Sequence, residues 1–338
     1  MTRADICAGV LWLGATFYAL FGGADFGGGF WDLVAGGAER GERPRAVIQR
    51  SLTPVWEANH VWLIFILVVL WTAFPPAFSA VMTTLYVPIA LAALGIVLRG
   101  SGFAFRKSIE GLSGRRAAGA TFAVSSLLTP FFMGPVVGAV AAGNVPADGN
   151  GAAFSSWLAP LPLLIGAMFV ASGAYLAAVF LVGDASRRGD DEMQRYFARR
   201  ALAAAAVAGV AAVFGLIELH AETRYVFDRL IDQGLPLVIL SALCGLGVLA
   251  ILLATARRPG APPWLLRPLA GGAVIAVIWG WGVAQFPYLL PTSLKISAAA
   301  APTDTLTSVI IVFLFAGIIV LPALGLLYWL SQRELLSE

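Results

Sequence analysis

The chain has 338 residues, of which 59% are hydrophobic and only 12% are Asp, Glu, Lys or Arg, about half the charged share of an ordinary soluble domain. So much apolar surface cannot be hidden inside a water-facing globule, which excludes a soluble enzyme and predicts that lipid surrounds most of the chain. The net charge of +3 comes from Arg in short connections, so nucleic acid is not an expected partner. Cys7 and Cys244 lie in separate apolar segments and form no disulfide or metal-binding pattern.

Apolar runs long enough to cross a bilayer recur along the whole chain. We expect an all-α membrane protein with nine transmembrane helices, near residues 6–35, 52–74, 77–99, 116–141, 158–183, 200–219, 235–256, 269–289 and 306–330. The first run is longer than a simple span and rich in Gly, which predicts a kink or close helix packing at its inner end. It shows no evident cleavage site, so we interpret it as a retained helix rather than a signal peptide.

The distribution of Lys and Arg predicts which side of the membrane each connection faces. Eighteen of the 22 Lys and Arg residues fall after the first, third, fifth and seventh expected helices and in the C-terminal tail. Because short cytoplasmic loops are enriched in these residues, we expect the N-terminus outside and the C-terminus in the cytoplasm. The charged segment 184–199 is then a cytoplasmic linker between approximate halves, 1–183 and 200–338, of a single transmembrane domain.

Ionisable side chains at membrane depth are costly, so each one is a functional candidate. On the expected topology, Asp25, Glu57 and Arg99 come from three different helices and fall in the cytoplasmic half. This arrangement is typical either of a proton entry route or of a structural ion pair. The remaining candidate acids are Asp32, which we interpret as a solvated acid at a helix end, and Glu218.

The segment Pro54–Trp62 is the densest group of polar and aromatic residues in any expected span. Trp56, Glu57 and His60 share one side of the helix because they are three or four residues apart. Glu57 and His60 match half of a di-iron carboxylate motif, but the chain lacks the second half, so no metal site is expected. The two histidines, His60 and His220, fall on opposite sides of the membrane and cannot serve as the axial ligands of several haems.

Two other function classes are weighed against these candidates. Prolines in or beside the expected spans break helices as they do in transporters, so a proton-coupled secondary transporter is the main alternative. Such transporters normally show paired broken helices in two related halves, and no pairing is visible in the sequence. A purely structural membrane scaffold predicts no buried acids, whereas this chain has several.

Three motifs in the first third of the chain resemble subunit II of the cytochrome bd-type quinol oxidases. They are GADFGGG at Gly23–Gly29, PVWEANHVWLI at Pro54–Ile64 and RGSGFAFR at Arg99–Arg106. Gly143–Pro146 and Gln285–Pro287 are similar to weaker family motifs. Length and expected helix count agree with the family over the whole chain.

The resemblance implies a terminal oxidase of the bacterial inner membrane that oxidises membrane quinol and reduces dioxygen to water. It implies a partner, subunit I, that carries haem b and haem d, so this chain alone is expected to bind no haem. It implies two four-helix bundles plus one extra helix, which support the haem subunit and contribute a proton route from the cytoplasm. It leaves open an oxygen path through this chain, a bound quinone and a small single-span third subunit.

The resemblance also implies roles for individual residues. The acids of the first two motifs correspond to Asp25 and Glu57, which we expect to relay protons, with His60 extending the path. Some members have Asp in place of Glu57, Gln in place of His60 and a further acid in place of Gly22, so the number of stations is open.

Four other positions follow from the same motifs. Arg99 and Arg106 correspond to paired family arginines, which we expect to form ion pairs with the acids. Trp56 corresponds to the first aromatic residue of the second motif and is expected to have a structural role. Trp62 corresponds to an aromatic residue near the oxygen path.

Overall fold

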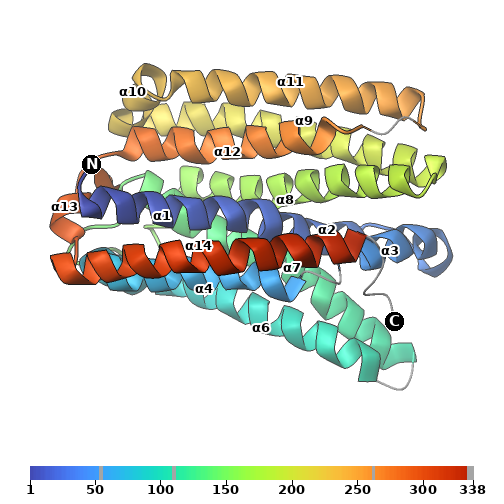
Figure 1. Cartoon of the computed structure of the whole chain (residues 1–338), viewed down its shortest axis with the longest axis horizontal. Coiled ribbons are helices and arrows are strands. Elements are labelled where there is room, and N and C mark those ends of the chain that lie inside the picture. Colours follow the sequence, from blue (N-terminus) through green and yellow to red (C-terminus); the bar gives the residue numbers. More distant parts are fainter. Residues whose placement is uncertain (53–55, 109–111, 261–262, 333–338) are drawn as a thin grey trace.

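The fold is a bundle of long helices that run side by side along its longest axis (Figure 1). The computed structural model describes residues 1–52, 56–108, 112–260 and 263–332. Helices satisfy their backbone hydrogen bonds internally, which a chain surrounded by lipid requires. Within the described ranges, the only strands are β1 (Tyr288–Leu290) and β2 (Leu294–Lys295), which pair antiparallel.

The N-terminal span is one apolar helix of 31 residues, Arg3–Leu33. It consists of α1 (Arg3–Phe17), a π-helical turn (Tyr18–Gly22) and α2 (Gly23–Leu33). A π turn inserts an extra residue into a helix and is frequent at functional sites. The irregularity that we expected in this run therefore takes the form of a π turn directly before the Gly-rich segment.

The next five helices continue the N-terminal half of the chain. They are α3 (Ala38–Leu52), α4 (Trp56–Ala73), α5 (Pro75–Thr84), α6 (Tyr86–Ser108) and α7 (Leu112–Ala141). Two prolines start α5, and Phe74 before them is not helical because proline disfavours that conformation in the preceding residue. Asn59–Ala73 and α5 are consequently bent by 119° against each other. We expected one span over 77–99. The structure instead has two helices there, α5 and α6, which are separated at Leu85.

The remaining helices form the C-terminal half. They are α8 (Pro160–Arg187), α9 (Asp191–Glu222), α10 (Arg224–Asp232), α11 (Leu235–Arg257), α12 (Leu266–Gln285), α13 (Ile296–Ala299) and α14 (Thr303–Gln332). The charged segment 184–199 is helical except for Arg188–Asp190, which connect α8 directly to α9. The division of the chain into halves stays a prediction.

Seven of the described helices are long and apolar enough to cross a membrane, or eight if α4 and α5 form one broken span. The apolar part of α6, Tyr86–Gly102, is shorter than these. An all-α membrane protein with multiple spans is thus confirmed, whereas the count of nine stays a prediction.

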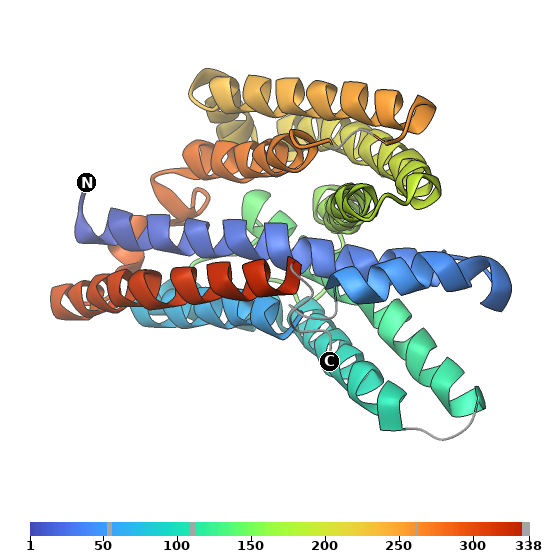
Figure 2. The ribbon, with the colours of Figure 1, turned by 45° about the vertical axis from the view of Figure 1, so that its right-hand side comes forward.

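The Arg-rich segments gather at one end of the bundle. In Figure 1, α3, the end of α8 with the start of α9, and the end of α11 lie on the right, while α10, α13 and the N-terminus lie on the left. The adjoining ends of α6 and α7 extend away from the other helices on the right in Figure 2. This distribution agrees with the alternation of Lys and Arg in the sequence.

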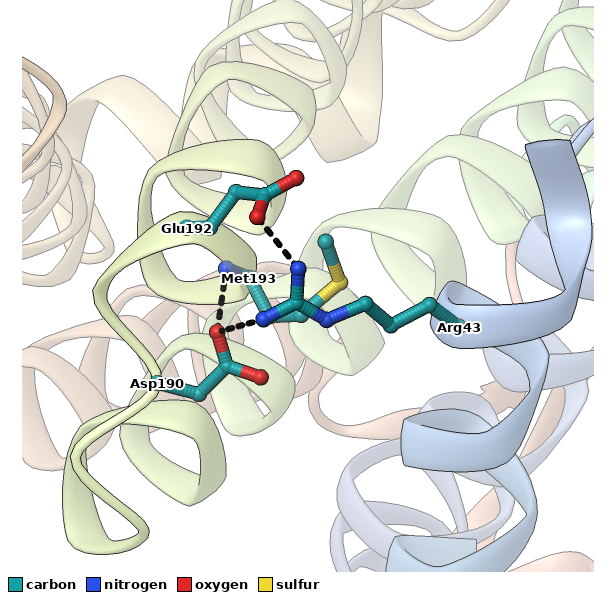
Figure 3. Close-up of polar contacts among 4 residues, drawn as sticks. All are labelled: Arg43, Asp190, Glu192 and Met193. Carbon is teal, nitrogen blue, oxygen red and sulfur yellow. Dashed lines mark hydrogen bonds and ion pairs between the residues drawn. The ribbon is translucent and has the colours of Figure 1, made fainter.

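An ionic cluster joins two of these segments at the Arg-rich end (Figure 3). Arg43 of α3 donates to Asp190, 2.9 Å away, and to Glu192 in the first turn of α9. Asp190 also caps α9, because its carboxylate accepts the backbone N–H of Met193 at 3.1 Å. The cluster is largely solvent-exposed, so it contributes little to the stability of the fold.

Small residues let the central helices approach closely. A Cβ on Gly27 of α2 would overlap the backbone carbonyl of Gly173 in α8, and one on Gly134 of α7 would overlap the backbone of Gly166. Membrane helices gain van der Waals contact from such approaches, since lipid provides no hydrophobic driving force between them. The Gly-rich motif of the first span therefore packs α2 against α8.

Gly27→Ala should lower the thermal unfolding midpoint of the purified protein, because overpacking a close contact costs about 1–3 kcal/mol. Gly9→Ala is the matched control, since a Cβ on Gly9 meets no atom within 4 Å. Fluorescence-monitored unfolding of both variants checks the contact. Equal midpoints for the two variants would contradict close packing of α2 on α8.

Candidate functional site

The most buried ion pair among the described residues joins α2 to α6. Arg99 Nη2 lies 2.8 Å from Asp25 Oδ1, and the two side chains are 1% and 4% exposed. The same nitrogen donates to the backbone carbonyl of Asp25 at 3.2 Å. A guanidinium in a membrane bundle needs such compensation because removing it from water is expensive.

Two aromatic rings complete the surroundings of Arg99. Its guanidinium carbon lies 4.5 Å from the ring centre of Phe26 and 4.9 Å from that of Phe122. Cation–π attraction of this kind is strongest when the cation is desolvated. Since Phe26 belongs to α2 and Phe122 to α7, the Arg99 side chain connects three helices.

His60 of α4 approaches the pair through Phe26. Its ring packs edge-on against Phe26 with the ring centres 5.9 Å apart. Asn59, the preceding residue in the same helix, is also buried. The structure thus brings Asp25, Arg99 and His60, which the sequence singled out separately, around one buried ring.

Trp62 lies elsewhere along α4. Its ring stacks on Phe17 at 4.5 Å between centres and meets Phe65 edge-on at 6.3 Å. This cluster faces α1 rather than the Asp25–Arg99 pair. Trp62 therefore belongs to an apolar aromatic surface between α1 and α4.

Three predicted site residues fall where the side chains are not described. The backbones of Trp56 and Glu57 begin α4, and that of Arg106 belongs to the last turn of α6. Their side chains lie outside the described part of the structure. Their predicted roles rest on the sequence alone.

Asp32 corrects one interpretation made from the sequence. We expected a solvated acid at a helix end, but Asp32 is 8% exposed and its Oδ1 lies 3.2 Å from Arg45 Nε. Arg45 also donates to the backbone carbonyls of Gly36 and Gly37. The expectation was wrong because α3 folds back over the end of α2 and supplies the partner.

Sequence reasoning missed a row of buried hydroxyl groups on α7. Ser125, Ser126 and Thr129 are at most 1% exposed, and each donates to a carbonyl three or four residues earlier in its own helix. Ser126 faces Gly29 of α2, and Thr129 faces Gly95 of α6. The i, i+3 and i+4 spacing of these residues, together with the glycines opposite, is the signal that could have found them.

The described residues contain no group of three or more His, Cys, Asp or Glu side chains that could hold a metal ion. His60 packs on Phe26, whereas His220, near the far end of α9, packs on Phe227 with ring centres 4.6 Å apart. The two histidines thus belong to separate aromatic contacts on different helices. Their placement does not fit a haem with both axial ligands from this chain.

Comparison with known proteins gives one consistent result. The family model described as cytochrome bd terminal oxidase subunit II matches residues 3–331. Cytochrome bd-I ubiquinol oxidase subunit 2 of Escherichia coli K12 is 27% identical over 334 residues, which cover 90% of this chain and 85% of that protein. Cytochrome bd ubiquinol oxidase subunit 2 of Bacillus subtilis 168 is 25% identical over 295 residues, which cover 86% and 81% of the two chains.

A solved structure shows the same fold. A chain of the bd oxidase from Geobacillus thermodenitrificans matches with a TM-score of 0.82 and 25% sequence identity, covering 97% of this chain and 98% of that one. The family model, the two relatives and this fold agree over nearly the whole length. The chain therefore belongs to the family of cytochrome bd terminal oxidase subunit II.

Proposed function

We propose that this chain is the haem-free subunit of a bacterial cytochrome bd quinol oxidase and that it conducts protons from the cytoplasm toward the haem-bearing partner. Family membership supports the place in a terminal oxidase complex. The buried Asp25–Arg99 pair is the observation that supports the proton route. An ionisable pair at membrane depth is costly and is typical of proton pathways.

The redox chemistry belongs to the partner. Quinol would be the source of the electrons that reduce dioxygen, and haem b and haem d of subunit I would carry them. The two histidines of this chain do not fit the two axial ligands of one haem, so we assign the chain roles in support, in proton transfer and in the oxygen path. A small single-span subunit and a quinone bound to this chain stay predictions.

The proposed topology follows from the Arg-rich end of the bundle. With nine spans in two four-helix bundles plus one helix, the Arg-rich end faces the cytoplasm and the N-terminus lies outside the inner membrane. Asp25 lies seven residues before Asp32, about 10 Å into the helix from that end at 1.5 Å per residue. Glu57, in the first turn of α4, is proposed to lie at the same end.

The proposed route begins at Glu57, which takes up a proton from water at the cytoplasmic end and passes it inward. Asp25 is proposed to take the proton next, and Arg99, 2.8 Å away, keeps its carboxylate in place. His60, packed on the same Phe26 ring, offers a nitrogen that extends the path. Arg106 and Trp56 are proposed to position the acids.

Trp62 is assigned to the oxygen path rather than to the proton route. Its neighbours are the rings of Phe17 and Phe65. Dioxygen is apolar and partitions into such apolar surroundings rather than among the polar groups of the proton route. The alternative function, a proton-coupled transporter, is set aside because the oxidase family model covers residues 3–331.

Arg99→Leu should impair assembly of the complex. Breaking a buried ion pair by removing one partner costs about 3–5 kcal/mol, because the other charge stays buried. The haem content of membranes and quinol-driven oxygen uptake measure the effect. Arg224→Leu, on the exposed surface of α10, is the control and should leave both unchanged. Normal haem content and oxygen uptake in Arg99→Leu membranes would show that the pair has no such role.

Glu57→Gln tests the proton route. The substitution keeps the size and hydrogen-bonding capacity of the side chain but removes its titrating group, so oxygen uptake per haem should fall by about tenfold or more, a conservative expectation for a proton-transfer group. Glu57→Asp should retain more activity because it still titrates. Glu218→Gln, at the other end of the bundle, is the control.

A purely structural Glu57 would give the opposite order, with Gln tolerated and Asp harmful. Full turnover per haem in Glu57→Gln would remove this residue from the proton route.

A further inference from the structure

Tyr18 is a buried polar residue that neither the sequence motifs nor the proposed route uses. It is the first residue of the π-helical turn and is only 8% exposed. In the described structure its hydroxyl makes one hydrogen bond, to Met133 Sδ at 3.5 Å. A thioether is a weak acceptor, so this bond restrains the direction of the hydroxyl only weakly.

The Tyr18 side chain belongs to the same cluster as the ion pair. The Tyr18 ring meets Phe26 edge-on with ring centres 6.5 Å apart. The same Phe26 ring makes the cation–π contact with the Arg99 guanidinium. The Phe26 ring is therefore a shared neighbour of Tyr18, His60 and Arg99.

The π turn and Gly22 together make room for this ring. A Cβ on Gly22 would lie 2.8 Å from Tyr18 Cε2, so only glycine lets the ring lie against the helix there. The aromatic ring of Tyr18 covers the backbone at that position.

The ion pair, whose Arg99 shares the Phe26 ring with Tyr18, has three buried polar atoms without a hydrogen-bond partner among the described residues: Asp25 Oδ2, Arg99 Nε and Arg99 Nη1. Buried polar atoms in proteins are paired with other groups or with ordered water. A water between the ion pair and the Tyr18 hydroxyl would satisfy them. Tyr18 comes seven residues before Asp25, so it lies deeper in the membrane for a proton that enters at the Arg-rich end.

We propose that Tyr18 is a further station of the proton route, receiving protons from Asp25 through a bridging water and passing them toward the membrane interior. The proposal rests on the proton route of the proposed function. In the transfer, Asp25 gives a proton to the bridging water while that water gives one of its own to Tyr18 Oη; the original Oη–H bond breaks, and its proton passes to a second water on the inner side of the phenol. The tyrosine is neutral before and after, so no oxidant or reductant is needed.

Tyr18→Phe in the whole oxidase complex tests this assignment, because it removes the hydroxyl but keeps the ring against Gly22 and Phe26. The measurement is the rate of proton uptake from the medium, followed with a pH dye when the reduced complex reacts with oxygen, normalised to haem. We expect uptake to slow by about tenfold, less than the roughly hundredfold that a positioned proton-transfer group can contribute, since water can partly replace the hydroxyl.

Tyr175→Phe is the matched control. Tyr175 is a buried tyrosine on α8, so Tyr175→Phe removes a phenol hydroxyl of the same kind and should leave proton uptake unchanged. A wild-type uptake rate per haem in Tyr18→Phe would overturn the assignment, even if the variant assembled poorly. An equal slowing in both Tyr→Phe variants would also overturn it, because the effect would then be structural.

Glu57→Gln, measured in parallel, separates this assignment from the proposed function. Slow uptake in Glu57→Gln with normal uptake in Tyr18→Phe would reject Tyr18 and leave the route in place. Normal uptake in both variants would reject the route itself.

Discussion

Burial of the Arg99 guanidinium is the constraint on which the centre of this bundle depends. Outside water the cation is tolerable only with an anion and good contacts around it. Asp25 supplies the anion at 2.8 Å, and Phe26 and Phe122 supply the aromatic faces. Since these partners come from α2 and α7, one side chain of α6 fixes the relative position of three helices.

The backbone around Asp25 is shaped to allow this arrangement. The π turn at Tyr18–Gly22 resets the face of the helix just before Asp25, and Gly27 lets α2 lie directly on α8. Because glycine has no side chain, the neighbouring helices can approach α2 closely at this point. Their polar groups and aromatic rings can then pack around Asp25. The cost of the irregular backbone is met by packing, as is common where π turns occur at functional sites.

Much of this could be predicted from the sequence, and the limits have physical causes. Apolar length and Arg distribution predicted a multi-span helical protein, and three motifs predicted the family that the comparisons then showed. The partner of Asp32 could not be predicted, because it depends on α3 folding back over α2. The position of Tyr18 near the ion pair could not be predicted either, because a π turn leaves no clear pattern in hydropathy. The role of the Glu57 side chain in proton transfer stays a prediction from its motif.

A double-mutant cycle on the ion pair tests the central claim most directly. Asp25→Asn, Arg99→Gln and the double variant are compared by the thermal unfolding midpoint of the assembled complex. If the two charges stabilise each other, each single variant leaves one buried charge uncompensated, and the double variant loses less than the sum of the two singles. Strictly additive losses would contradict the account, because they would mean that Asp25 and Arg99 contribute independently and that the pair does not hold the three helices together.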